Sequence, residues 1–61
     1  MQHEFSVDVP GVGKVDVERQ NDGQDDFWDL FADDGSCLNE GNPFWSLPTA
    51  DEVIKFVQEN H

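Results

Sequence analysis

Lysine and arginine are scarce in this chain. It has 3 of them against 14 aspartates and glutamates, for a formal net charge of −11 over 61 residues. A protein that binds nucleic acid neutralises phosphates with basic side chains, so this balance excludes direct nucleic-acid binding. Attraction to an anionic membrane surface is excluded by the same sign of charge. We therefore expect neither nucleic acid nor a membrane among the partners of this protein.

Long apolar runs and cysteine are also lacking. The longest apolar runs are two to three residues, too short for a membrane span of about 20 residues or for the centre of a signal peptide. The one cysteine, Cys37, cannot close an internal disulfide of the kind that stabilises many small secreted domains. We expect a soluble, cytoplasmic protein with a single small domain over residues 1–61.

Aromatic residues argue that this acidic chain folds. Disordered acidic chains have few aromatics, whereas this one has 5 Phe and 2 Trp. Scaling with mass predicts a folded surface of about 4,000 Å² and a stability that is marginal at this size. Association is therefore a plausible supplement to the stability of the fold.

The first half of the chain has the pattern of a β-hairpin. Residues 4–9 alternate strictly between apolar and polar, and residues 14–19 resume the alternation with Val15 and Val17. Such a period of two is typical of a half-buried strand. Pro10-Gly11 lies between the two segments and suits the central positions of a turn.

A second hairpin is predicted around Asp34-Gly35, a strong signal for a two-residue turn. A polar loop over residues 20–26 precedes this hairpin. Residues 27–32 form its first strand and residues 36–40 its second. This turn places Ala32 opposite Cys37, Phe31 opposite Leu38 and Asp29 opposite Glu40. We assign to the core the face with Trp28, Leu30, Ala32 and Cys37; the other face carries Phe27, Phe31 and Leu38.

The C-terminal segment is predicted to be an amphipathic helix. Thr49 and Glu52 fit a capping box, and a single helical face then collects Val53, Ile54, Phe56 and Val57. The fold class is therefore α+β: an antiparallel meander of three to four strands with one C-terminal helix packed on one face, in the order ββββα.

One short helix covers only one face of such a sheet. The irregular segment with Phe44 and Trp45 either folds back over the second face or leaves its aromatics exposed. An exposed apolar patch rimmed by carboxylates is typical of a surface that binds a protein. The predicted partner-binding residues are Phe27, Phe31, Leu38 and Trp45. The predicted edge strands offer strand addition as a second route.

An acidic row supports an alternative hypothesis. Residues at i and i+2 of a strand lie about 6.7 Å apart on one face. The outer face of the first hairpin would thus carry a grid of carboxylates from Glu4, Asp8, Asp16 and Glu18. Since a DNA strand carries one negative charge per about 3.4 Å, the grid could imitate phosphates and occupy a basic nucleic-acid-binding protein.

Signals for catalysis and metal binding are weak. The aspartates between Asp22 and Asp34 do not fit the calcium-loop pattern in either glycine alignment, which leaves only weak divalent cation binding open. Cys37 could form a thiolate pair with His3 or His61, but both histidines lie near a terminus where nothing orients them. We therefore expect no enzyme, no cofactor, no metal ligands and no small-molecule substrate.

The sequence as a whole favours a non-enzymatic protein-interaction module. Its partner is either another protein or a second copy of the chain, which would make a homodimer through the aromatic sheet face. The alternative is the acidic mimic of nucleic acid.

Overall fold

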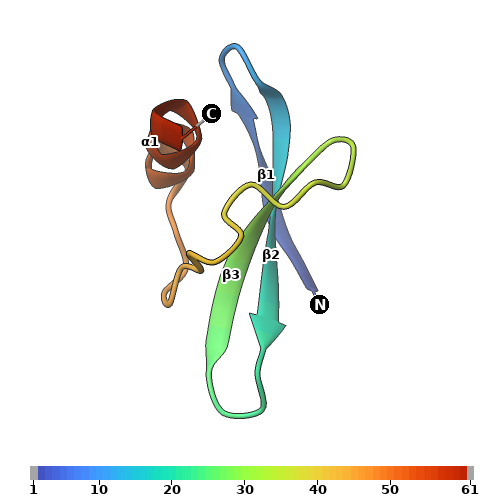
Figure 1. Cartoon of the computed structure of the whole chain (residues 1–61), viewed down its shortest axis with the longest axis vertical. Coiled ribbons are helices and arrows are strands. Elements are labelled where there is room, and N and C mark those ends of the chain that lie inside the picture. Colours follow the sequence, from blue (N-terminus) through green and yellow to red (C-terminus); the bar gives the residue numbers. More distant parts are fainter. Residues whose placement is uncertain (1, 61) are drawn as a thin grey trace.

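The computed structural model describes residues 2–60, which form an antiparallel sheet and one helix (Figure 1). The strands are β1 (Gln2–Val9), β2 (Gly13–Asn21) and β3 (Asp26–Ala32), in the sheet order β1-β2-β3, and the helix is α1 (Ala50–Asn60). The α+β meander with a C-terminal helix is confirmed, with three strands in the sheet. The accessible surface, 3949 Å², agrees with the area expected from mass.

The first hairpin forms where the alternation predicts it. The Val12 amide donates to the Val9 carbonyl at 3.0 Å, and Gly11 between them has φ of 83°. A positive φ at the second central position, after proline at the first, defines a type II turn. Opposite each other beyond this turn, Val7 and Val15 both face the core.

The loop between β2 and β3 is held by its own polar side chains. Asp22 accepts hydrogen bonds at Oδ1 from the amides of Gln24 and Asp25, at 2.9 and 2.8 Å. These backbone donors, Asp25 first, lower the pKa of the Asp22 carboxyl below its ordinary value. Asn21 Oδ1 accepts from the Gly23 amide at 2.6 Å. At least part of the acidic stretch therefore has a local structural role.

The second turn has three residues rather than two, which corrects the predicted register. Gly35 has φ of 88° and donates to the Ala32 carbonyl at 2.9 Å, and the Ala32 amide donates to the Ser36 carbonyl. This is the three-residue hairpin loop with a left-handed glycine at its end. Phe31 therefore lies opposite Cys37. A slip of one residue exchanges the two faces, so Leu38 packs against the core and half-buried Cys37 does not belong to it.

Residues 36–40 do not continue as a fourth strand, because the Asn39 side chain replaces the backbone there. Its Oδ1 accepts from the Leu30 amide at 2.9 Å, and its Nδ2 donates at 3.3 Å to the carbonyl of Trp28 and to that of Asn42. Asn39 is 2% exposed. The chain then makes a turn over residues 39–42 and returns to β3 at Phe44. Phe44 exchanges two backbone hydrogen bonds with Trp28, at 2.8 and 3.1 Å. The outer edge of β3 is therefore already occupied.

The core lies between the sheet and α1, which packs against β1. The capping box forms as predicted: the Glu52 amide donates to Thr49 Oγ1 at 3.2 Å, and the Thr49 amide donates to Glu52 Oε1 at 3.0 Å. The ring of Phe44 meets that of Phe56 edge to face, with centroids 5.5 Å apart. The buried side chains of the hydrophobic core are Val7, Val9, Val15, Val17, Leu30, Val53 and Val57.

Candidate functional site: the outer face of the sheet

One face of the sheet points away from the core and from α1, which lies on the opposite side (Figure 1). We call it the outer face. Its members follow from the strand alternation and the register of the strand pairs. They are His3, Ser6 and Asp8 from β1; Lys14, Asp16, Glu18 and Gln20 from β2; and Phe27, Asp29 and Phe31 from β3.

The predicted aromatic patch is present in part. Phe27 and Phe31 lie on the outer face and are half-buried. Trp45 is 63% exposed and its ring contacts that of Phe27, with centroids 5.8 Å apart and an interplanar angle of 56°. Leu38 does not join them, because in the corrected register it packs against the core on the other face. The Phe44-Trp45 segment thus divides its two rings between the core and the outer face.

The predicted acidic row is interrupted at its first residue. Asp8, Asp16 and Glu18 lie on the outer face, but the pairing of β1 with β2 has a bulge at Glu4, between His3 and Phe5. The Glu4 carboxylate lies 3.5 Å from Nε of Arg19. Arg19 is two residues from Val17 on β2 and therefore lies on the same side of the sheet, the side opposite the outer face. A bulge inserts one extra residue and re-aims its side chain. The regular grid of four carboxylates therefore does not form on one face.

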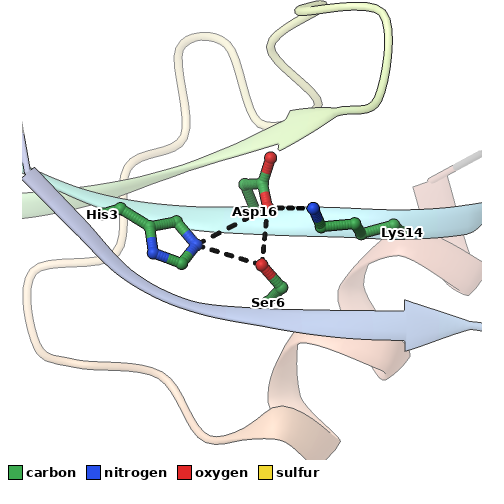
Figure 2. Close-up of polar contacts among 4 residues, drawn as sticks. All are labelled: His3, Ser6, Lys14 and Asp16. Atoms are coloured by element: carbon green, nitrogen blue, oxygen red, sulfur yellow. Dashed lines mark hydrogen bonds and ion pairs between the residues drawn. The ribbon is translucent and has the colours of Figure 1, made fainter.

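Asp16 is surrounded by polar and basic groups (Figure 2). Ser6 Oγ donates to Asp16 Oδ1 at 2.6 Å, and Lys14 Nζ and His3 Nε2 lie 3.8 and 3.6 Å from the same oxygen. The Ser6 hydroxyl, followed by the charges of Lys14 and His3, lowers the pKa of the Asp16 carboxyl. The charge of Asp16 is thus balanced within the chain.

His3, Ser6 and Asp16 are the residue types of a catalytic triad, but not in its arrangement. In a triad the hydroxyl donates to one imidazole nitrogen, and the carboxylate accepts from the other. Here Ser6 donates directly to Asp16, while His3 Nε2 faces both, at 3.0 Å from Ser6 Oγ. All three contacts lie at an exposed surface. The cluster can balance charge, but it does not activate the Ser6 hydroxyl as a nucleophile.

Cys37 and His3, the predicted thiol and imidazole that the structure describes, do not meet. Cys37 Sγ lies 3.5 Å from Asn39 Oδ1 beside β3, whereas His3 contacts Ser6 on β1. His61 lies outside the described residues. Across residues 2–60, no group of three or more His, Cys, Asp and Glu side chains is placed to hold a metal ion.

Glu18 and Asp29 lie directly opposite each other on β2 and β3. Asp29 Oδ2 accepts a hydrogen bond from Gln20 Nε2 at 2.6 Å. Burial raises the pKa of the Asp29 carboxyl, and the bond from Gln20 opposes this rise. Within the described part of the chain, neither carboxylate has an ion pair. Sequence reasoning missed this pair because it depends on the register between β2 and β3.

An open hollow of about 330 Å³ lies at the end of the sheet where β2 turns into β3. It is lined by Gln2, Arg19, Gln20, Asn21 and Asp26. The guanidinium of Arg19 already contacts Glu4 and donates to Gln2 Oε1. Among its described lining residues, the hollow therefore presents no cation that is free to hold a charged substrate.

Comparisons with known protein families, curated proteins and solved structures found no match. No helix within residues 2–60 has both the length and the apolar character needed to cross a membrane.

Proposed function

We propose that this chain is a non-enzymatic protein-interaction module that binds a partner protein through the outer face of its sheet, in the cytoplasm. The observation that carries this proposal is the Phe27–Trp45 ring pair. Trp45 keeps 63% of its surface exposed although it rests against Phe27. Tryptophan is enriched among the residues that dominate binding energy at protein interfaces.

The surroundings of this ring pair also suit an interface. Leu47, two residues along the same segment, is 52% exposed, and half-buried Phe31 extends the apolar surface along β3. Carboxylates on β2 and β3 border these apolar groups. An apolar centre with a polar rim is the usual composition of a protein-binding patch.

Strand addition is the less favoured route. Backbone and side-chain groups from residues 36–44 already form hydrogen bonds with the β3 backbone at Trp28, Leu30 and Ala32. Among the strands of residues 2–60, only β1 remains as an edge for a partner strand, and the bulge at Glu4 interrupts its regular pairing. Bulges of this kind protect edges from pairing with other chains.

A homodimer through the outer face would bring like charges together. A two-fold axis places the same patch on both copies, so the surface that carries Asp8, Glu18 and Asp29 would face the same acidic surface of the second copy. Like charges placed opposite each other at an interface oppose association. The module therefore binds a different protein. Mimicry of nucleic acid finds less support, because Glu4 leaves the row and Asp16 is balanced by Lys14.

The proposal is tested by capture from the native cell, with two single substitutions compared. Trp45→Ser removes the exposed ring of the patch. Val12→Ser removes another exposed apolar side chain, 42% exposed, in the turn between β1 and β2. The captured protein is then purified, and its affinity for each variant is measured by titration calorimetry.

We expect Trp45→Ser to weaken binding at least about tenfold, as for a central aromatic at an interface. Val12→Ser should bind like the wild type. Equal binding by all three chains would contradict the proposal. Sedimentation over a range of concentrations provides a separate check, since a mass that doubles with concentration would indicate a homodimer instead.

A further inference from the structure

We infer that the outer face binds an arginine side chain of the partner between Glu18 and Asp29. This inference rests on the proposed function and specifies the chemistry of the partner: a segment that carries arginine. Three features support it: the register of β2 and β3, the rings beside Asp29, and the contacts that the few basic residues of the chain already make.

The register brings the two carboxylates to neighbouring positions. Glu18 and Asp29 are direct cross-strand partners, and the Cβ atoms of such partners lie about 4.5–5.5 Å apart. Like charges at this spacing destabilise a sheet. A guanidinium carries several N–H donors in one plane and can donate hydrogen bonds to both carboxylates at once. Binding an arginine would therefore remove a repulsion that the free chain retains.

Aromatic rings lie on both sides of Asp29 along its own strand. Phe27 and Phe31 are each two residues from Asp29, which places them on the same face about 6.7 Å away in either direction. Both rings are half-buried, and Trp45, whose ring contacts that of Phe27, extends the aromatic surface there. A planar guanidinium stacks on such rings, whereas the ammonium of lysine is a compact and strongly hydrated charge. The surroundings therefore favour arginine over lysine.

The basic groups of the chain do not serve this position: His3, the β1 partner of Glu18 in the register, forms its ion pair with Asp16. The chain has 3 Lys plus Arg: Lys14 lies at Asp16, Arg19 contacts Glu4, and Lys55 is exposed on α1. Neither Glu18 nor Asp29 has an ion pair within residues 2–60. Because the one arginine is held by Glu4, a second copy does not supply a free guanidinium. The occupant is thus an arginine of another protein.

Defined peptides provide the test with the full chain. The probe is a short capped peptide that alternates arginine and leucine, compared with one in which lysine replaces arginine. In a third peptide, citrulline keeps the shape of arginine without its charge. Affinities are measured by calorimetry at about 0.15 M salt, where the screening length is about 8 Å.

Three substitutions remove one negative charge each. Glu18→Gln and Asp29→Asn alter the proposed site, and Glu59→Gln is the matched control on the exposed side of α1. An amide at either site position keeps a hydrogen-bond acceptor, and two-dimensional NMR spectra verify that each variant is folded. We expect Glu18→Gln and Asp29→Asn each to weaken the arginine peptide about five- to tenfold, and Glu59→Gln to change its affinity less than about twofold.

The lysine peptide should bind several-fold more weakly than the arginine peptide, and the citrulline peptide should not bind. The inference is overturned if Glu59→Gln weakens binding as much as the site variants do, because the attraction would then come from the overall charge alone. It is also overturned if lysine binds as well as arginine, or if the arginine peptide does not bind. In those cases a loss of partner binding in Trp45→Ser would still support the proposed function.

Discussion

Replacing Asn39 by alanine tests how the edge of β3 is closed. Asn39 is 2% exposed, and the Leu30 amide donates to its Oδ1 at 2.9 Å. Truncation leaves that buried amide without an acceptor, which costs about 1–3 kcal/mol. The Nδ2 bonds to the Trp28 and Asn42 carbonyls are lost as well, at about 0.5–1.5 kcal/mol each. Since such terms are not additive, we expect a total loss of about 2–4 kcal/mol.

That loss is large for a domain of this size. At about 0.05–0.15 kcal/mol per residue, a chain of 61 residues has a free energy of unfolding of about 3–9 kcal/mol. Urea titration followed by tryptophan fluorescence measures the change, and hydrogen exchange at the Leu30 amide reports it locally. We expect the Asn39→Ala midpoint to fall sharply and the Leu30 amide to lose much of its protection.

Asn42→Ala is the matched control. Asn42 is exposed, and its hydrogen bonds with Asn39 come from its backbone amide and carbonyl, which alanine retains. Its free energy of unfolding should stay within about 0.5 kcal/mol of the wild type. A change as small as this in Asn39→Ala, with the Leu30 amide still protected, would refute the assigned role of the Asn39 side chain.

Two further predictions concern the register of the second turn and the response to pH. Leu38→Ala should lower the free energy of unfolding, measured by urea titration, by about 2–4 kcal/mol because Leu38 packs on the core. Cys37→Ala should lower it clearly less. The reverse order would contradict the three-residue turn and support the two-residue turn. Asp22 and Asp34 have carboxyls whose pKa is lowered from 3.8, chiefly by backbone amides. Their stabilisation is therefore complete above pH 3.8 and is lost as the pH falls through the lowered pKa, so urea midpoints should decrease over that acidic range. A midpoint that rises there would contradict this sign.

The elements that the sequence predicts correctly are those with local signals. Pro10-Gly11 sets the first turn within four residues of chain, and Thr49 and Glu52 satisfy each other across the first turn of α1. Each of these features depends on neighbours in sequence and not on the rest of the fold. The first turn and the helix cap could therefore be predicted from the sequence without any tertiary contact.

The second hairpin shows where local signals stop. Asp34-Gly35 suits a two-residue turn and also the end of a three-residue loop. The choice between them changes which of Leu38 and Cys37 faces the core. The folded chain packs the larger apolar side chain, half-buried Leu38, against the core and fills the next position with the Asn39 amide. Core packing across the whole domain settles this register, and no short stretch of sequence contains that information.

The candidate site was predictable to the same extent. Alternation alone places Phe27 and Phe31 on one face, and it correctly separates them from Trp28. The contact of Trp45 with Phe27 depends on how a loop returns to β3. The proximity of Glu18 to Asp29 follows from the register across the polar loop of residues 22–25, and the departure of Glu4 from the acidic row follows from a bulge. Neither the proximity of Glu18 to Asp29 nor the bulge at Glu4 has a recognisable signal in the sequence.

An NMR titration of the isotope-labelled chain with the arginine–leucine peptide tests the central claim most directly, because it reports which face of the sheet the ligand contacts. We predict the largest shifts at the backbone amides of Glu18 and Asp29 and at the indole N–H of Trp45, with little change on the exposed side of α1. The largest shifts on α1 or along the β1 edge would contradict the claim that the outer face is the binding surface.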